Sequence, residues 1–282
     1  MLGEAMTSPI LVTGGTGTLG RLVVQRLRDA GRNVRVLSRR SREAEAGIEF
    51  MTGDLTTGEG IEPAADGVET IVHLAGSAKG DEDKTRNLVQ AASSQTRLPH
   101  LVYISVVGAD RIPVASRVDR AMFGYFASKW AAEKVVEDSG LPWTTLRATQ
   151  FHEGMLAVAR QMAKLPVLPV PVGFYFQPLE ADEVASRLVE LTLDEPSGLV
   201  PNMGGPRVYG AAELLRGYLR ATKRQRLIVP VWLPGKAARE FRAGANLVPE
   251  HAVGHRTWEE FLAETLRQRR PAPRVGTSSA SV

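Results

Sequence analysis

The stretch ILVTGGTGTLGRLVVQRL, from Ile10 to Leu27, decides the fold of this chain. An aliphatic run leads into Gly14, Gly17 and Gly20, spaced G-x-x-G-x-x-G, and an amphipathic helical pattern follows. The first glycine permits a tight turn, the second lets the backbone approach a pyrophosphate, and the third lets helix and strand pack closely. Backbone N–H groups at the helix N-terminus then meet the phosphates. A glycine-rich turn without a ligand is the alternative, which the strand–turn–helix setting disfavours.

The first half of the chain alternates strand and helix patterns. Five short apolar runs, each closed by Gly, Ser or Thr, are PILVTG (9–14), NVRVLS (33–38), IEFMTG (48–53), ETIVHLAG (69–76) and HLVYIS (100–105). Their nearly continuous apolar content is typical of strands covered on both faces, as in a parallel sheet. Helical patterns lie between them, at Leu19–Ala30 and Glu82–Ser94, and a sixth strand pattern, WTTLRA, follows at 143–148. We therefore predict an α/β protein with a doubly wound parallel-sheet Rossmann fold.

The alternation stops at about Phe151. The stretch LPVLPVPVGFYFQPLE (165–180) is too rich in proline for a core strand and predicts edge strands or a long loop. Its GFYFQP segment could form an aromatic pocket wall or simply core. Helices are expected over ADEVASRLVELTL (181–193), with Asp182 as a plausible N-cap, and over Ala211–Thr222 and Thr257–Arg269.

These patterns predict four parts of the chain. Residues 1–8 are expected to be a flexible N-terminal extension, and residues 9–150 the NAD(P)-binding Rossmann core. Residues 151–270 would complete the fold and form a small, irregular C-terminal substrate lobe. Residues 271–282 have the composition of a disordered tail.

Composition excludes several classes of protein. The chain has 282 residues, of which 43% are hydrophobic and 23% charged, as in ordinary globular proteins. It has no cysteine, which excludes disulfides and thiolate chemistry. No apolar run approaches the roughly 20 residues of a membrane helix, and the start lacks the plan of a secretory signal. We therefore expect a cytoplasmic protein without a membrane partner.

The net charge of +4 is mildly basic. The densest basic run, RGYLRATKRQR (216–226), contains Tyr218 as its only aromatic residue. Nucleic-acid surfaces usually interleave basic with aromatic or glycine residues on one face, so a solvated helix side is the favoured interpretation. We expect a small-molecule substrate and no nucleic-acid partner; the oligomeric state stays open.

The end of the second strand pattern bears on the choice of cofactor. NAD-selecting folds usually place Asp or Glu roughly 20 residues after the glycine loop, to bind the ribose 2′-hydroxyl. Here Ser38, Arg39 and Arg40 occupy that place. Arg39 could make a forked, charge-assisted contact with a 2′-phosphate. This favours NADP(H), with NAD(H) possible; the alternative is that both arginines are solvated loop residues.

Several motifs together resemble the extended and atypical short-chain dehydrogenase/reductase superfamily, and most closely its NmrA-like, NAD(P)H-binding branch. They are TGGTGTLG (13–20), GDL (53–55), HLAG (73–76), YIS (103–105), YFASK with a following AE (125–133), and SGLPWTTLR (139–147). The resemblance covers about residues 9–205. It implies a catalytic triad of Ser105, Tyr125 and Lys129. The cofactor contacts expected for this chain are Gly14, Thr16, Gly17, Thr18, Leu19, Gly20, Ser38, Arg39, Arg40, Asp54, Leu55, Leu74, Ala75, Gly76 and Lys129.

The spacing of the triad makes chemical sense. Ser105 ends the fifth strand pattern, at the sheet edge where open α/β folds bind ligands. Tyr125 and Lys129 are i,i+4 neighbours on one helix face, and the apolar residues around the lysine suggest that it faces a cleft. Tyr125 would donate a proton to a carbonyl oxygen while Ser105 hydrogen-bonds that oxygen. Alternatively, Lys129 pairs with Glu133 on the surface and Tyr125 is a packing aromatic.

The segment also departs from the family pattern. Gly124 stands where proline commonly precedes the tyrosine, and Ala148 replaces the proline usual after LR. These departures leave open whether the pair is catalytic.

Residues after the sixth strand pattern are candidates for the substrate pocket. They are Gln150, Phe151, His152 and Met155. His152 could act as an acid or base, or be a hydrogen-bonded wall residue. His251 and His255 have a spacing that can bind metal on a helix, but Gly254 lies between them and no nearby carboxylate completes a site, so no metal is expected.

Three functions remain open. The first is an NADP(H)-dependent oxidoreductase that transfers hydride to a carbonyl, quinone or conjugated small-molecule acceptor. The second is a non-catalytic NADP(H)-binding redox sensor or regulatory protein. The third, which the short C-terminal lobe disfavours, is an epimerase or dehydratase that keeps NAD tightly bound.

Overall fold

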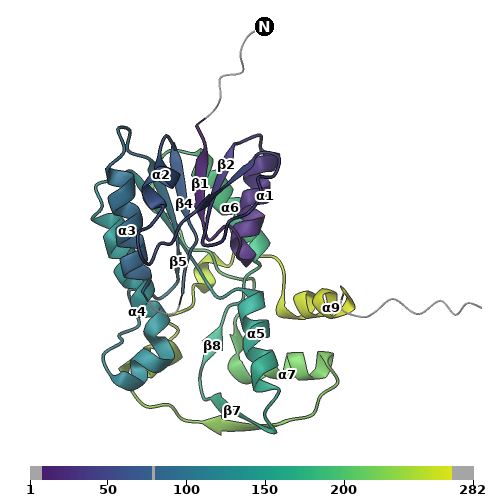
Figure 1. Cartoon of the computed structure of the whole chain (residues 1–282). Coiled ribbons are helices and arrows are strands. Elements are labelled where there is room, and N and C mark those ends of the chain that lie inside the picture. The colour runs from purple at the N-terminus through teal and green to yellow at the C-terminus, as the bar shows by residue number, and fades with distance from the viewer. Residues whose placement is uncertain (1–7, 78–79, 269–282) are drawn as a thin grey trace, which may run out of the picture.

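A seven-stranded parallel sheet forms the centre of the molecule (Figure 1). The computed structural model describes residues 8–77 and 80–268. The sheet order is β3-β2-β1-β4-β5-β6-β9, so the chain leaves β1 toward both edges, which is the doubly wound arrangement. The strands are β1 (Ile10–Thr13), β2 (Val34–Ser38), β3 (Ile48–Thr52), β4 (Thr70–His73), β5 (His100–Val106), β6 (Trp143–Ala148) and β9 (Gly198–Leu199).

Helices cover both faces of this sheet. On one face α1 (Thr18–Asp29) packs against α6 (Ala181–Leu193), and on the other lie α2 (Ile61–Ala65), α3 (Asp81–Ser93) and α4 (Arg117–Glu137). Side chains of β1 alternate between two buried clusters: Ile10 and Val12 face α1 and α6, and Leu11 faces the opposite layer. This period of two places an apolar residue against each layer in turn, which explains the continuous apolar runs in the sequence.

The C-terminal part packs below the carboxyl ends of the strands (Figure 1). Its helices are α5 (His152–Met162), α7 (Ala211–Ala221), α8 (Lys236–Arg242) and α9 (Trp258–Gln268), with a 3₁₀ turn at Pro249–His251. β7 (Val167–Pro171) pairs with β11 (Leu227–Val231), and β8 (Tyr175–Phe176) pairs with β10 (Tyr209–Gly210). A cluster around Phe241 joins this part to α4.

The predicted Rossmann fold is confirmed, and each of the six predicted strands is present within three residues of its expected bounds. The proline-rich stretch forms short strands outside the main sheet, as one of its two interpretations required. The N-cap prediction is wrong: Glu180 occupies the N-cap position of α6, without a side-chain capping hydrogen bond. Asp182 lies in the first turn, where it pairs with Arg26 of α1 at 2.6 Å.

Segments after residue 150 also contribute to the sheet layers, since α6 covers one face and β9 adds the last strand. The expected N-terminal extension, apart from Ser8, and the expected disordered tail lie outside the described residues. In the described ranges, no helix combines the length and the apolar character needed to cross a membrane.

Candidate active site

The three glycines of the loop after β1 meet three different spatial demands. Gly14 has a φ of 70°, and a Cβ there would lie 2.6 Å from the backbone N of Ala75. A Cβ on Gly20 would lie 2.1 Å from the carbonyl oxygen of Gly14, so α1 and the loop are in direct contact. Gly17 is exposed and is the N-cap of α1, where no side chain caps the helix. The glycines therefore have the roles that their spacing indicated: Gly14 permits the turn, Gly17 leaves an open approach, and Gly20 allows close packing.

The start of α1 fits a pyrophosphate. The first N–H groups of a helix have no intrahelical acceptor, and here they belong to Thr18, Leu19 and Gly20. The first turn contains no acidic side chain that would repel an anion. Arg21 donates from Nε to the carbonyl oxygen of Thr16 at 2.9 Å, which ties the loop to the helix. The helix dipole then favours negative charge at this point.

Gly20→Ala tests the packing of this loop. The added Cβ meets backbone atoms, not a flexible side chain, so we expect the free energy of unfolding to fall by about 1–3 kcal/mol and dinucleotide binding to weaken. Urea unfolding and calorimetric titration measure both. Gly17→Ala is the control for stability, because its Cβ would approach only the Gly14 oxygen, at 3.3 Å. Equal stability of the two variants would contradict the packing role.

The residues expected at the adenosine end lie at the ends of β2 and β3. Arg39 and Arg40 are exposed directly after β2, and the backbone N of Arg40 donates to Ser38 Oγ at 3.3 Å. Asp54 accepts from the backbone N of Thr56 at 2.8 Å, and this bond is the main cause that lowers the pKa of its carboxyl, with a smaller effect of Arg39. The Leu55 side chain is instead packed in the core.

A largely apolar cavity of about 730 Å³ lies at the carboxyl edge of the sheet. Ser105 from β5 and Tyr125 and Lys129 from α4 all line it. Four other residues expected to contact the cofactor also line it: Thr18 and Leu19 at the start of α1, and Leu74 and Gly76 after β4. Its apolar walls include Phe123, Phe126, Phe174, Phe176 and Phe241. The cavity thus brings the glycine loop and the candidate triad together beside an aromatic surface.

Lys129 is buried, with an exposure of 3%. Its Nζ donates to the carbonyl oxygen of Ile104 at 3.1 Å and to the hydroxyl of Tyr103 at 3.3 Å. It also forms an ion pair with Asp81 Oδ2 at 3.5 Å. Since an ammonium has three N–H donors, each has a protein group in reach. Burial lowers the pKa of Lys129, and Asp81 opposes this effect.

Asp81 begins α3 and is 1% exposed. Its Oδ1 accepts from the backbone N of Ser77 at 2.7 Å and lies 3.7 Å from Nζ of Lys84. A buried carboxylate therefore balances the charge of Lys129 beside the cavity. The sequence motifs gave no indication of this residue.

Tyr125 is 41% exposed overall, with its ring edge-on against Phe126. Protein atoms surround its phenol group, and this burial, together with the charge of Asp81, raises the pKa of Tyr125 to about 12. The phenol is therefore neutral at pH 7 and can donate a hydrogen bond. Ser105 is 5% exposed, and its Oγ has no hydrogen-bond partner among the described residues.

Glu133 contacts Arg147 of β6 instead of Lys129. The Arg147 guanidinium donates to both carboxylate oxygens of Glu133 at 2.6–3.1 Å and to Asp110 at 2.9 Å. This buried pair fixes α4 to β6. The surface pair between Lys129 and Glu133, which was one alternative, is thus not formed.

The four candidates after β6 divide into two groups. Gln150, Phe151 and Met155 line the apolar cavity. His152 does not: it is fully buried, its Nε2 lies 3.0 Å from the carbonyl oxygen of Arg256, and its ring stacks on Phe261. Burial also lowers the pKa of His152. The first residue of α5 turns toward α9, so the expectation that His152 lines the pocket is corrected.

Histidine, aspartate and glutamate also occur away from this cavity. In the part of the chain that the structure describes, no group of three such side chains is arranged to hold a metal ion.

A parallel Rossmann sheet with a glycine loop shaped for a pyrophosphate defines a dinucleotide-binding protein. A family model described as NAD(P)H-binding matches residues 14–165, more than half of the chain. The chain therefore belongs to this family and binds a nicotinamide cofactor, and its resemblance to the atypical short-chain dehydrogenase/reductases is confirmed.

Several curated proteins are similar to the chain. The photosystem II assembly factor Ycf39 of Trieres chinensis is 26% identical over 73% of this chain and 66% of its own length. The (4-alkanoyl-5-oxo-2,5-dihydrofuran-3-yl)methyl phosphate reductase of Streptomyces griseus is 31% identical over 53% of this chain and 50% of its own. The NAD(P)H azoreductase of Xenophilus azovorans is 27% identical over 58% and 56%. The chain thus spans about half to two thirds of the length of these relatives.

Solved structures share the fold. The NADPH-dependent quinone oxidoreductase QOR2 of Escherichia coli, complexed with NADPH, superposes with a TM-score of 0.73 over 91% of this chain and 99% of its own, at 19% identity. A UDP-glucose 4-epimerase of Thermus thermophilus in complex with NAD gives a TM-score of 0.65 over 93% of this chain and 100% of its own, at 20% identity. Both a reductase and an epimerase therefore have this fold, so the fold alone does not indicate which reaction a protein catalyses.

Proposed function

We propose that this protein is an NADP(H)-dependent oxidoreductase that reduces a carbonyl, quinone or conjugated small-molecule acceptor. One observation carries the proposal: a single apolar cavity of about 730 Å³ is lined by residues of the glycine loop and by Ser105, Tyr125 and Lys129. A bound reduced nicotinamide would supply the hydride.

The cavity residues can perform the remaining tasks. Tyr125, neutral at pH 7, and Ser105, whose Oγ has no partner among the described residues, can both hydrogen-bond an acceptor oxygen that gains negative charge. The phenylalanine walls, including Phe174 and Phe241, exclude water and suit a flat, apolar acceptor. Lys129, held by Asp81, keeps a positive charge near the site.

The preference for NADP(H) rests on the end of β2. No carboxylate follows this strand, and Arg39 is exposed there. An arginine would attract the 2′-phosphate, whereas Asp or Glu would repel it. The name of one structural neighbour, an NADPH-dependent quinone oxidoreductase, agrees with this choice, whereas the name of a similar protein, an NAD(P)H azoreductase, covers both cofactors.

Arg39→Ala is expected to weaken NADPH binding by roughly 10- to 150-fold, because a charge-assisted hydrogen bond contributes roughly 1.5–3 kcal/mol. NADH has no 2′-phosphate and serves as the internal control, so its affinity should not change. Calorimetric titration measures both constants. If the unmodified protein binds NADH as tightly as NADPH, the assignment of the cofactor is wrong.

The proposed reaction is tested with the purified protein, NADPH and a panel of quinones and aldehydes. Loss of NADPH absorbance that depends on both the acceptor and the protein supports the oxidoreductase. Stoichiometric binding of NADPH without oxidation across the whole panel rejects it.

A non-catalytic NADP(H) sensor is the second candidate, and one observation favours it. Nζ of Lys129 already hydrogen-bonds Ile104 and Tyr103 and forms an ion pair with Asp81, so protein groups occupy the ammonium that would otherwise contact a ligand. The same titration without turnover would support this candidate.

A further inference from the structure

Three polar atoms on the wall of the apolar cavity lack hydrogen-bond partners. They are Ser105 Oγ, Gln150 Nε2 and Glu153 Oε2, and each is closed off from solvent in the described part of the chain. An unpaired polar atom in such surroundings destabilises the folded protein, and native proteins usually pair these atoms with protein, water or ligand. Of the three, only Glu153 carries a carboxyl group that can give a proton to a substrate and regain it.

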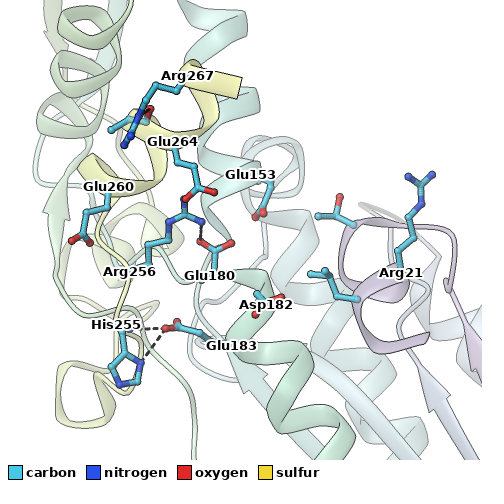
Figure 2. Close-up of a pocket in the computed structure, with 13 residues that line it drawn as sticks. Arg21, Glu153, Glu180, Asp182, Glu183, His255, Arg256, Glu260, Glu264 and Arg267 are labelled. Atoms are coloured by element: carbon cyan, nitrogen blue, oxygen red, sulfur yellow. Dashed lines mark hydrogen bonds and ion pairs between the residues drawn. The ribbon is translucent and has the colours of Figure 1, made fainter. Parts of the chain in front are cut away.

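Glu153 stands between two cavities. It lies in the first turn of α5 and lines the apolar cavity with Tyr125. It also lines a larger cavity of about 1080 Å³, bounded by the starts of α1 and α6 and by α9. Figure 2 shows its carboxyl directed into this second space, opposite Arg21 of α1. The Glu153 side chain therefore borders both the apolar cavity and the more open, polar cavity.

The second cavity is lined by several carboxylates and by three arginines, Arg21, Arg256 and Arg267. Arg256, the nearest cation of the loop before α9, binds Glu180 at 2.9 Å and also pairs with Glu264. Both ends of its guanidinium are thus engaged. The other charged or titratable groups that line these two cavities are Arg21, Asp182, Glu183, His255, Glu260, Arg267, Tyr125 and Lys129. Glu153 also lines a third, smaller pocket together with Arg160.

The protonation of Glu153 agrees with this setting. Burial raises the pKa of its carboxyl; its own backbone N–H opposes the shift, Glu180 adds to it, and Arg256 opposes it. A raised pKa keeps the acid form to a higher pH than an exposed glutamate would. Tyr125, in contrast, holds its proton too strongly to be an efficient donor near neutrality.

We propose that Glu153 delivers the proton of the reduction, from the polar cavity to the acceptor oxygen in the apolar cavity. This inference rests on the proposed function. The acceptor carbon would gain a hydride from the reduced nicotinamide dinucleotide, and the C=O π bond would break. The electron pair left on oxygen takes the Glu153 proton, and the new carboxylate regains a proton from water. A carbonyl acceptor is thereby reduced to an alcohol. On a quinone such as menadione the hydride adds instead to a ring carbon conjugated with the C=O, the electron pair moves to oxygen and takes the same proton, and enolisation of the second C=O completes the hydroquinone. In both cases the dinucleotide is oxidised.

Glu153→Gln tests the proposal with menadione as the acceptor. Glutamine keeps the shape of the glutamate side chain but has no carboxyl proton to transfer. We expect kcat to fall by about 10²-fold or more, with little change in the KM for NADPH. Asp182→Asn removes a charge from the same polar cavity, but Asp182 does not line the apolar one, so it is the matched control. It should retain the activity of the unmodified protein.

The pH profile separates proton delivery from a merely structural role. Activity of the unmodified protein should decline as pH rises through the pKa of Glu153, because the acid form disappears. Glu153→Asp should keep this decline, and Glu153→Gln should lack it. Infrared spectra without cofactor, recorded as a pH series, add a readout independent of turnover: a protonated carboxyl band that persists to higher pH than that of an exposed glutamate should be absent in Glu153→Gln.

Two results would overturn the inference. If Glu153→Gln retains full turnover and an unchanged pH profile while the unmodified protein is active, proton delivery by Glu153 is wrong and the oxidoreductase stands. If the unmodified protein oxidises no NADPH with any acceptor, both proposals fail.

Discussion

Tyr125→Phe is expected to lower turnover of NADPH with menadione by about 10²–10³-fold, the usual effect of removing one donor to a developing oxyanion. The variant loses only the hydroxyl, while the ring still packs on Phe126. NADPH affinity should stay nearly intact, because the glycine loop and Arg39 supply the binding contacts proposed above.

Steady-state kinetics and calorimetric titration measure these two quantities. Tyr175→Phe is the control, since Tyr175 is 45% exposed and does not line the apolar cavity. Retained turnover in Tyr125→Phe would remove this hydroxyl from the chemistry. Lost cofactor affinity would instead assign it to binding.

Arg147→Ala should lower the free energy of unfolding by about 3–5 kcal/mol, because it leaves the charge of a buried carboxylate uncompensated. Glu133 is 6% exposed, and Arg147 alone donates to it through three contacts of 2.6–3.1 Å in the described ranges. Urea unfolding followed by circular dichroism measures the change.

An exposed ion pair of the same helix provides the comparison. Lys134 contacts Glu137 at 2.6 Å, and both side chains are about half exposed. Lys134→Ala should cost about 0–1 kcal/mol. If the two variants lose similar stability, the buried pair does not have the role assigned to it. The double variant Glu133→Ala/Arg147→Ala should lose less stability than the sum of the single variants.

Much of the fold could be predicted from local patterns. Strands β1, β4 and β5 are buried along their whole length, so their largely apolar composition identifies them without knowledge of their neighbours. The glycine loop is similarly local, since its spacing alone sets the turn and the helix contact. Helix α5 was not predicted, and Gly154 in its first turn weakens the helical pattern there.

The site was only partly predictable because its decisive contacts join distant segments. Asp81 meets Lys129 only after α3 and α4 pack side by side. Nothing near Glu153 in the sequence indicates that it lines two cavities. The prediction for His152 failed for the same reason, since its burial depends on Trp258 and Phe261 of α9, about a hundred residues later in the chain.

The late position of α6 has a consequence for the order in which the molecule assembles during synthesis. The helix covers the apolar side chains of β1 and α1, yet it emerges from the ribosome only after residue 181. Until then, side chains such as Val23 and Leu27 lack the partner that shields them from water. The nascent chain therefore exposes an apolar, aggregation-prone surface on α1 and β1 until α6 has been synthesised. This layer of the sheet can reach its native packing only after that point.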